Sequence, residues 1–383
     1  MKHLTSLALL TIATFHPSSS LARVWTVEAN GSGDAPTIQA AVDSSTSGDI
    51  IELEDGTFTG DGNRDVDTRY LELTFRSRSN VAENCVIDCQ GSLTDNHRAF
   101  LLHRTCEFKG LTIINGFAFP RGGAIVSYKQ EGGLRVYGCT FVNNTSSEGG
   151  AIGFQGVFRS IEEVDIQKSE FLRNHGEYGG AVYIAFFYAS FKECQFIDNT
   201  SDWSAGAVSF IRSGVQFKSC VFAGNKAAVG GALYCYGDGA IMSCTFVGNL
   251  ATVHVGGAHI RSFGYETVVT VRNSILAFGQ RGGSVACGDQ EDYNIEPVCC
   301  DVFGNEGGNW VDCLRFHQGK YGNISEDPLF CDWTGGDYSL SAESPCAAGS
   351  ADNDCGLMGA FDVGCGPTAV ETKSWGVIKA FYR

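Results

Sequence analysis

Residues Cys220-Val-Phe222-Ala-Gly-Asn225-Lys-Ala-Ala-Val-Gly230-Gly-Ala-Leu233 carry both parts of a motif that recurs along the middle of the chain. One part is a Phe followed three residues later by an Asn, and the other is the triplet Gly-Gly-Ala. The triplet or a close variant begins every 25 to 30 residues, at Gly122, Gly149, Gly179, Ala205, Gly230, Gly256 and Gly282. The other part recurs in phase, at Phe141/Asn144, Phe171/Asn174, Phe196/Asn199, Phe222/Asn225 and Phe246/Asn249. A fixed period of this length indicates a repeat architecture, in which each unit buries its apolar face against its neighbours.

The apolar residues within each unit alternate with other residues, as in Val182-Tyr-Ile184 and Val215-Gln-Phe217. A period of two predicts short strands with one face inward, and runs of helical periodicity are absent from the repeats. A unit of about 25 residues with three short strands predicts a right-handed parallel β-helix, an all-β solenoid. Between Val24 and about Cys287 there is room for about ten coils, each roughly 4.8 Å high.

Each recurring residue has an expected structural role in such a coil. The Phe residues should stack as rings along the core. The Asn residues follow an inward strand, where a left-handed turn is needed, and their side chains can bond one another along the axis. Gly-Gly should supply the positive φ that opens the next strand. A row of Asn could also bind a ligand, but the turn role is the one that the coils require.

The chain divides into four segments. Residues 1–22 carry Lys2, an apolar run and a small-x-small pattern ending at Ala22, which predicts a cleaved signal peptide. The β-helix is expected over residues 23–290, a Cys-rich closing segment over 291–367 and a separate tail over 368–383.

Each end of the predicted solenoid has a distinctive segment. A short helix that begins at Pro36 and buries Ile38, Ala41 and Val42 is expected to cap the N-terminal end. The C-terminal tail has apolar residues at helical spacing with Lys and Arg between them. It is interpreted either as a sorting signal or as an element docked on the last coil.

The composition excludes some classes of partner. The 383 residues carry a formal net charge of −16. Such an acidic chain is unsuited to nucleic acids and to anionic membrane surfaces. No run of residues is long and apolar enough for a transmembrane helix. We therefore expect a protein that is secreted or displayed at the cell surface, without a transmembrane segment, and a monomer.

Sixteen cysteines in an exported chain predict an oxidising compartment. Eight lie outside the regular repeats and are interpreted as a framework composed mostly of disulfides, with zinc binding less favoured because no Cys-x-x-Cys pair is present. They are Cys287, Cys299, Cys300, Cys313, Cys331, Cys346, Cys355 and Cys365.

Four further cysteines precede the recurring Phe by two residues and should stack inside the coils: Cys139, Cys194, Cys220 and Cys244. Ser169 holds this position between Cys139 and Cys194, so those two cysteines are roughly 9.6 Å apart. That separation exceeds the reach of a disulfide. Cys139 is predicted to be a free buried thiol, and the other three can form at most one bridge.

Several segments resemble families of known fold. The N-terminal segments resemble the opening of pectin-lyase-like right-handed β-helix proteins, and they are Asn30-Gly-Ser-Gly-Asp34, Pro36-Thr-Ile-Gln-Ala-Ala41, Gly48-Asp-Ile-Ile-Glu-Leu53 and Gly56-Thr-Phe58. The Gly-Gly-Ala and Phe-x-x-Asn pairing resembles the repeats of chlamydial polymorphic outer-membrane proteins. The segments Asp327-Pro-Leu-Phe330 and Asp337-Tyr-Ser-Leu340 resemble the closing region of bacterial secreted β-helix proteins with surface anchors. The resemblance implies the fold; the superfamily contains lyases, hydrolases, adhesins and passive surface proteins.

The catalytic motifs of the related enzymes are not matched. The chain has no Asp-Asp and no Gly-His-Gly, and Asn63-Arg-Asp65 alone matches one polygalacturonase spacing. The calcium-dependent lyases need carboxylates stacked on one sheet, and the candidates do not share one coil position. They are Asp165, Glu170, Asp198 and Asp202. Asp88 resembles a β-helix strand carboxylate and is interpreted as a solvated turn residue.

Three other clusters of residues could form a binding site. Asp61, Asp65 and Asp67 lie in a Gly-rich loop that could hold calcium, although a solvated acidic loop is favoured. His254 and His259 could form a metal pair without an evident third ligand. His259 stands where other units carry Ile, Val or Leu, so its coil should be distorted or its face shifted.

A group of aromatic residues could form a sugar-stacking platform, although some of its members must belong to the core. They are Tyr183, Phe186, Phe187 and Tyr188. The sequence therefore predicts a secreted or cell-surface β-helix with a structural, adhesive or glycan-binding role, and a polysaccharide or cell-surface glycan as partner. It assigns no catalytic, cofactor-binding or metal-binding residue, with calcium an open alternative. The other function class is a polysaccharide lyase or glycoside hydrolase acting on acidic polysaccharide.

Overall fold

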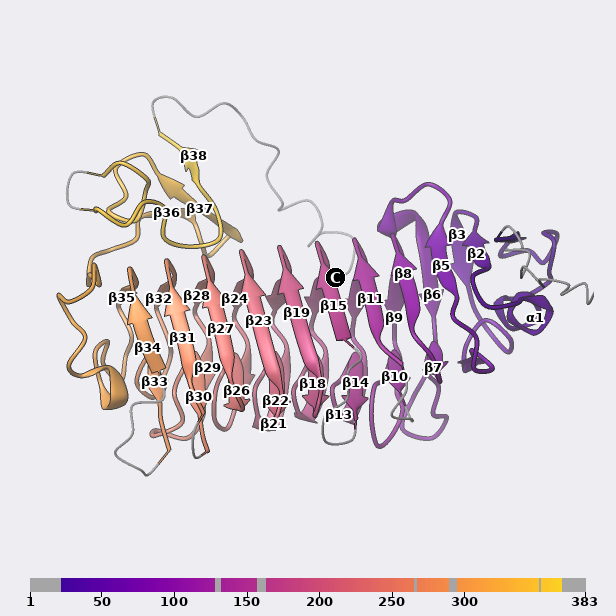
Figure 1. The fold of residues 1–383 in the computed structure, drawn as a ribbon, viewed down its shortest axis with the longest axis horizontal. Coiled ribbons are helices and arrows are strands. Elements are labelled where there is room, and N and C mark those ends of the chain that lie inside the picture. Colours follow the sequence, from indigo (N-terminus) through magenta and orange to yellow (C-terminus); the bar gives the residue numbers. More distant parts are fainter. Residues whose placement is uncertain are drawn as a thin grey trace, which may run out of the picture.

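The computed structural model describes residues 22–127, 132–156, 163–264, 267–288, 295–350 and 353–366. The predicted signal peptide up to residue 21 and the predicted tail over 368–383 lie outside the described residues. The chain folds into a right-handed parallel β-helix, as predicted, with a small C-terminal unit packed against one side (Figure 1).

The first and longest sheet has 11 strands, one for each coil, so the solenoid is one coil longer than the ten expected. Ile324 forms a further bridge with Asp301 beyond the last coil. The strands of the first sheet are β1 (Val24–Val27), β2 (Ile50–Leu53), β5 (Thr74–Ser77), β8 (Cys106–Lys109), β11 (Leu134–Tyr137), β15 (Glu163–Gln167), β19 (Tyr188–Lys192), β23 (Gly214–Lys218), β27 (Gly239–Met242), β31 (Val269–Arg272) and β34 (Ile295–Val298).

The sheets are numbered in the order in which the chain passes through them within one central coil. The second sheet carries the recurring Phe residues. Its strands are β3 (Gly56–Phe58), β6 (Cys85–Asp88), β9 (Thr112–Ile114), β12 (Thr140–Val142), β16 (Glu170–Leu172), β20 (Gln195–Ile197), β24 (Val221–Ala223), β28 (Thr245–Val247), β32 (Ile275–Ala277) and β35 (Asp301–Phe303). The fourth sheet follows the Gly-Gly-Ala triplets. Its strands are β4 (Val66–Asp67), β7 (Phe100–Leu102), β10 (Ile125–Ser127), β14 (Ile152–Gln155), β18 (Val182–Ala185), β22 (Val208–Ile211), β26 (Leu233–Tyr236), β30 (Ile260–Ser262) and β33 (Val285–Ala286).

The central coils contain one strand more than the three expected. These strands form the third sheet and are β13 (Thr145–Glu148), β17 (His175–Tyr178), β21 (Thr200–Ser204), β25 (Lys226–Ala227) and β29 (Leu250–Ala251). They are polar and short, so apolar alternation could not reveal them. β21 contains a β-bulge, because the register shifts between Gly176 and Tyr178 of its partner.

The Phe ladder lies in the core as predicted. Phe222 is fully buried, and its ring stacks on Phe196 and Phe246 with centroids 4.9 and 4.6 Å away. Phe141 and Phe171 continue the stack with a centroid distance of 4.9 Å. The spacing equals the rise of one coil, so each ring contacts the same residue type above and below.

The Asn ladder bonds along the axis as predicted, but its backbone role differs from the prediction. Asn174 Oδ1 accepts hydrogen bonds from both the backbone N and Nδ2 of Asn144, each at 3.0 Å. Its own Nδ2 donates to the carbonyl of Phe141. The left-handed residue is the one before each ladder Asn, for example Asn143 with φ 55°. The ladder Asn is therefore retained for its buried side-chain amide.

The two glycines of each triplet are required for different structural reasons. Gly149 has φ 70°, which favours glycine as expected. Gly150 does not have a positive φ, but a Cβ atom there would lie 2.2 Å from the carbonyl oxygen of Gly180 in the next coil. The second glycine is thus required by close stacking of the coils.

Helix α1 (Ile38–Ser44) caps the N-terminal end, with Ile38, Ala41 and Val42 buried as predicted. Its N-cap is Thr37, whose side chain accepts a hydrogen bond from the backbone N of Ala40, so the helix begins two residues after Pro36. Two 3-10 turns are also present, η1 (Ala82–Asn84) and η2 (Asp312–Leu314).

Cys299–Cys355 and Cys331–Cys365 are disulfides within the closing segment and Cys287–Cys313 joins it to the β-helix, while Cys300 and Cys346 remain buried thiols. Its strands are β36 (Phe330–Asp332), β37 (Asp337–Ser341) and β38 (Val363–Cys365). Cys139 is a buried thiol as predicted, and its backbone N donates to Ser169 Oγ of the next coil. No bridge joins Cys194, Cys220 and Cys244.

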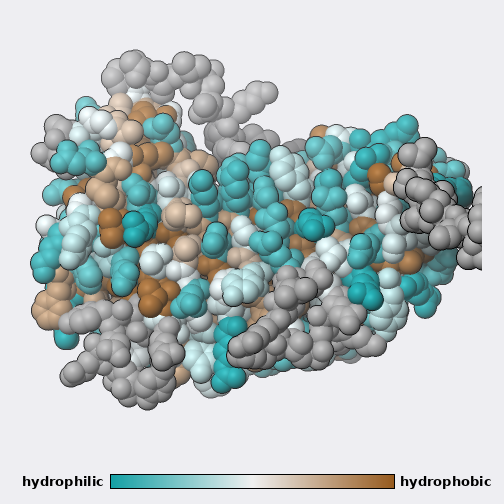
Figure 2. All heavy atoms as spheres, viewed as in Figure 1, coloured by the Kyte–Doolittle hydropathy of each residue, from teal (hydrophilic) through white to brown (hydrophobic). Residues whose placement is uncertain are grey.

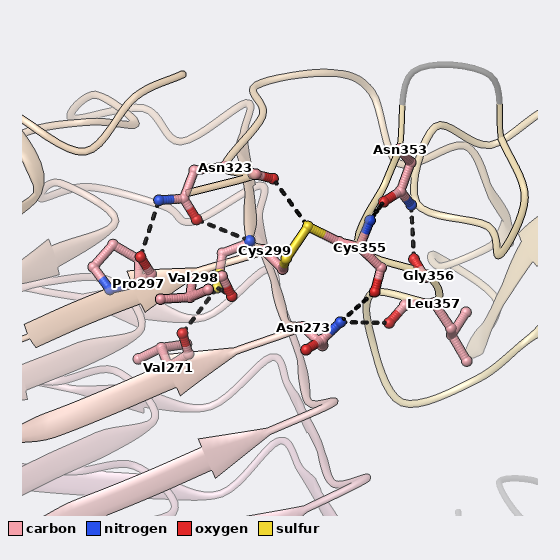
Figure 3. Close-up of a disulfide and its surroundings, with 12 residues drawn as sticks. Val271, Asn273, Pro297, Val298, Cys299, Asn323, Asn353, Cys355, Gly356 and Leu357 are labelled. Atoms are coloured by element: carbon pink, nitrogen blue, oxygen red, sulfur yellow. Dashed lines mark hydrogen bonds between the residues drawn. A yellow bond between two sulfur atoms is a disulfide. The ribbon is translucent and has the colours of Figure 1, made fainter. Parts of the chain in front are cut away.

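Residues 355–361 of the closing segment, here called the strap, run back along the outer face of the second sheet. Asn273 Nδ2 donates to the carbonyl oxygens of Cys355 and Leu357, next to the Cys299–Cys355 disulfide (Figure 3). Gly359 N donates to the carbonyl of Asn273, and Ala360 N donates to Thr245 Oγ1 at 2.9 Å. Outward apolar side chains such as Val221 and Val247 are buried beneath this unit.

Candidate functional site: a groove on the first sheet

A shallow groove of about 720 Å³ crosses five strands of the first sheet, from β15 to β31. These strands lie side by side along the molecule (Figure 1). The lining comprises Glu163, Tyr188, Ala189, Ser190, Gly214, Val215, Gln216, Asp238, Gly239, Ala240, Val268 and Thr270. Viewed from the same side as Figure 1, the molecule presents many hydrophilic residues with smaller hydrophobic areas between them (Figure 2).

The groove is hollow because most outward positions in neighbouring coils carry a small side chain or none. Ser190, Gln216, Ala240 and Thr270 are paired in one register row on β19, β23, β27 and β31. Gly214 is aligned with Tyr188 in the preceding coil. A Cβ atom at Gly214 would lie 2.8 Å from the Tyr188 ring, so the ring lies across this glycine.

Tyr188 is the aromatic surface of the groove. Its side chain is 66% exposed, although residues on both sides of it in the chain are buried. Exposed aromatic rings with a polar end are well suited to contact ligands that are partly apolar and partly hydroxylated. The hydroxyl groups of Ser190 and Thr270 and the amide of Gln216 add hydrogen-bonding groups beside it.

Charged residues border the groove on two sides. Asp238 Oδ1 accepts a hydrogen bond from Val268 N at 3.0 Å, which holds this carboxylate at the rim. Each of the groove residues Ser190, Gln216 and Thr270 is followed two positions later by a basic residue. These basic residues lie on the same face of the sheet, and they are Lys192, Lys218 and Arg272. Lys192 pairs with Glu193 at 3.3 Å. The groove thus has a polar floor, the carboxylates of Glu163 and Asp238 in its lining and a basic flank beyond it.

The predicted aromatic platform does not exist as one surface. Phe187 is buried and packs edge-on against Phe154, while Tyr183 lies on β18 of the fourth sheet, where burial raises its pKa to about 12. Phe186 adopts φ 64° in the turn between them. Only Tyr188 reaches the groove, because each turn of the coil directs neighbouring residues to different sheets.

The candidate lyase carboxylates are also separated. Asp165 faces outward on β15, Glu170 on β16 and Asp202 on β21, and Asp198 lies in the turn between β20 and β21. They do not share a coil position, in agreement with the prediction. Asp88 ends β6, and its Oδ1 accepts hydrogen bonds from Gln90 N and Asn115 Nδ2, as suits a turn residue.

The three carboxylates weighed for calcium engage three different partners. Asp61 pairs with Arg64, Asp65 with His97 and Asp67 with His103. Among the described residues, no group of three or more His, Cys, Asp or Glu side chains is arranged to hold a metal ion.

The two histidines weighed as a metal pair lie in different environments. His254 is exposed in the loop that precedes β30, whereas His259 is fully buried. His259 is aligned with Ala232, and Ile260 is aligned with Leu233. The sequence of this coil is therefore displaced by one residue relative to the repeat, which is the shift that was expected. The displacement points the His259 side chain into the core.

The groove residues Ser190, Gly214, Gln216 and Thr270 were missed by reasoning from the sequence. Each is an ordinary outward residue of an alternating strand. Only the pairing of strands across five coils places them together. The available signal was the small side chains of Ser190, Ala240 and Thr270 at one repeat position.

Comparisons with known proteins give limited matches. Residues 219–236 match the Chlamydia polymorphic membrane protein (Chlamydia_PMP) repeat. The metabotropic glutamate receptor-like protein P of Dictyostelium discoideum is 27% identical over an alignment of 285 residues that covers 65% of this chain. The chain spans only 19% of that relative's length.

Two solved structures of the pectin methylesterase from Aspergillus niger are similar to this chain. They share 15% and 14% sequence identity with it, at TM-scores of 0.36 and 0.37. In both cases 81% of this chain and 92% of the other chain are covered. No helix among the described residues has the length and apolar character needed to cross a membrane. The chain is a right-handed parallel β-helix whose repeats are like those of the Chlamydia polymorphic membrane proteins.

Proposed function

We propose that this protein is a secreted or surface-displayed β-helix that binds a polysaccharide strand along the groove of the first sheet. The observation that carries the proposal is the groove itself, with the exposed Tyr188 ring lying across Gly214. The three disulfides support an oxidising, extracellular location.

The repeat of the fold suits a repeating ligand. A linear polysaccharide presents one sugar after another along a line, and the groove presents one side chain per coil along a line. Ser190, Gln216 and Thr270 can bond to hydroxyl groups, while the Tyr188 ring can cover the apolar face of one sugar. The protein then needs no deep pocket, because several weak contacts add along the strand.

The basic flank favours an acidic polysaccharide. Lys192, Lys218 and Arg272 stand beside the groove, although the whole chain carries a net charge of −16. A strand with carboxylate groups would be attracted to this flank and repelled by Glu163 and Asp238, so it should lie on the basic side of the groove. Binding should weaken as salt is raised, because these lysine and arginine side chains are at the surface.

The test is calorimetric titration of purified protein with neutral and uronate-containing oligosaccharides. Tyr188→Ala and Gln216→Ala should each weaken binding by about tenfold, which corresponds to roughly 1.4 kcal/mol. Tyr321→Ala is the matched control, because Tyr321 is 67% exposed but belongs to the closing segment. Unchanged affinity in both groove variants would exclude the groove as the binding surface.

The alternative function is cleavage of an acidic polysaccharide by a lyase or hydrolase. Hydrolysis needs two carboxyl groups about 5–10 Å apart in one cleft. The four carboxylates considered for this role lie on different faces and in a turn, which favours the binding function. The two functions are separated by assaying the same oligosaccharides for cleavage.

A further inference from the structure

A second cavity, of about 320 Å³, lies on another face of the molecule, between the second sheet and the strap. Its walls come from the turns that lead into β16, β20 and β24, and from Ala360 and Phe361 of the strap. Polar groups of Lys168, Glu170, Glu193, Gln195 and Ser219 face it. A volume at the low end of the range for ligand sites suits a small molecule.

The cavity is held open by covalent and hydrogen-bonded anchors. The Cys299–Cys355 disulfide fixes one end of the strap, and the Cys331–Cys365 disulfide fixes the chain beyond it. Between them, Ala360 N is bonded to Thr245 Oγ1. The strap therefore holds Phe361 opposite the sheet before any ligand arrives, which lowers the entropic cost of binding.

The two carboxylates of the cavity differ in their charged neighbours. Glu193 pairs with Lys192 at 3.3 Å and with Lys168 at 3.8 Å. Glu170 stands one coil away, aligned with Gln195, and its carboxyl group is largely buried. Burial raises the pKa of Glu170 to about 7, and the negative charge of Glu83 in η1 adds to the rise. Within the described chain, neither a hydrogen bond nor a cation counters this rise.

We propose that this cavity binds a small organic cation, whose ammonium group pairs with Glu170 and whose apolar part lies against Phe361 and Val221. A cation supplies the missing counter-charge of a carboxylate that the fold has buried near a second acid. The Phe361 ring lines the cavity, where it can contact an ammonium group or an apolar substituent. This inference goes beyond the proposed function and concerns a different sheet.

The ionisation of Glu170 sets the pH dependence. The charged groups around it are Glu83 on η1 and Lys168 and Glu193 on the turns, while the strap lines the cavity with Ala360 and Phe361 alone. A cation binds the ionised carboxylate, so affinity should rise as pH increases through about 7. For a carboxyl group with a pKa of about 7, the ionised fraction is roughly 30-fold larger at pH 8 than at pH 5.5. Cation binding should therefore be tighter at pH 8 by the same factor.

The experiment is calorimetric titration of the full protein with methylammonium, tetramethylammonium and phenethylammonium at both pH values. At least one cation should bind at pH 8, bind at least tenfold more weakly at pH 5.5, and release a proton when it binds near pH 7. Phenethyl alcohol, the uncharged counterpart of phenethylammonium, should not bind. Failure of all three cations to bind at millimolar concentration overturns the proposal.

Two variants locate the site. Glu170→Gln should abolish binding, and it should fold because the next coil carries Gln195 at the same position. Asp165→Asn removes a carboxylate from the first sheet instead and should leave cation binding unchanged. Binding that survives Glu170→Gln in a protein with an unaltered melting curve would also overturn the proposal. Polysaccharide binding by Glu170→Gln should remain normal, which separates this site from the groove.

Discussion

Nε2 of His259 lies 2.8 Å from Oδ1 of Asn305 and closes a gap in the Asn ladder. The coil between Asn249 and Asn305 has Gly279 at the ladder position and thus supplies no amide. A Cβ atom at Gly279 would lie 3.0 Å from His259 Nε2, so the imidazole occupies the space of the missing side chain. On its other side, Nδ1 accepts a hydrogen bond from Asn249 Nδ2 at 3.1 Å. A neutral imidazole with its proton on Nε2 satisfies both partners.

Removal of this imidazole should destabilise the fold. His259→Ala removes one buried hydrogen bond from each of Asn249 and Asn305 and opens a cavity, at a cost of about 2–4 kcal/mol in the free energy of unfolding. Chemical denaturation measures the change. His254→Ala, at an exposed position in the same coil, should alter the midpoint little. Equal effects of the two variants would refute the bridging role of His259.

The same residue should make the protein sensitive to acid. Burial lowers the pKa of His259 to about 4, below the 6.5 of an unperturbed histidine. Between these values the unfolded chain takes up a proton that the folded chain does not, so stability falls as pH is lowered through the window. The loss should reach about 3 kcal/mol near pH 4. His259→Gln should flatten this part of the stability–pH curve, and a slope equal to wild type would contradict the prediction.

Asp301 should make the protein less stable as pH rises, which is the opposite of the effect of His259. Asp301 begins β35 and is fully buried against the closing segment, where Cys346 Sγ donates to its Oδ2. Burial raises its pKa from 3.8 to about 7. The folded chain therefore holds a proton that the unfolded chain has lost, and this contribution is present in full below pH 3.8 and is lost as pH rises to 7. The difference in stability between wild type and Asp301→Asn should change by up to about 4 kcal/mol across that range, with the wild type losing more.

The core ladder predicts a large effect at one position. Phe222→Ala should reduce the free energy of unfolding by about 3–5 kcal/mol, because the ring is buried between Phe196 and Phe246. Phe316→Ala is the control, since Phe316 is 52% exposed. Unchanged thermal unfolding of Phe222→Ala would mean that the ladder does not face inward.

Cysteine chemistry can be checked on the denatured protein. Mass mapping without reductant should find the three disulfides of the closing segment and free thiols at the remaining ten cysteines, including Cys139. The solenoid cysteines are enclosed in the core, so they should react with alkylating reagents only after unfolding. A Cys139–Cys194 bridge would be incompatible with the coil register.

Enzyme assays should be negative. We expect no cleavage of pectin, polygalacturonate or alginate, with or without millimolar calcium, because the candidate carboxylates do not share a cleft. Release of unsaturated uronides or of new reducing ends measures the reaction. Positive release that is lost in Asp88→Ala or Asp198→Ala would establish the alternative function and locate its site.

The regular part of the fold was predictable because the same residue returns at the same place in every coil. Phe141 to Phe246 and Asn144 to Asn249 each lie in one register, and stacked strands allow only one such alignment. The disulfide-rich character of the closing segment was also evident from the spacing of its cysteines. The pairing of those cysteines was not, since eight cysteines permit many connectivities.

The candidate sites depend on contacts that no local pattern describes. The predicted platform is wrong because its residues, although close in sequence, point in different directions. Tyr183 lies on the fourth sheet, Phe187 lies in the core and Tyr188 lies in the groove. His259 was assigned to an apolar strand position because the triplet was counted from Gly256. The structure aligns Gly257 with the earlier glycines that adopt positive φ, which displaces the coil by one residue.

The sequence by itself determined the repeat, the inward Phe ladder, the bonding of Asn side chains along the axis, the N-terminal cap and the disulfide-rich end of this protein. These features follow from local alternation and a constant period, so neighbouring coils repeat the same contacts. Tertiary structure alone decided the groove beside Tyr188 and the cavity around Glu170. Both require side chains from different coils to meet, and the cavity also requires the strap to return to β24 from more than one hundred residues later in the chain. Such contacts are set by the register of strands and the path of the closing segment, which no short segment encodes.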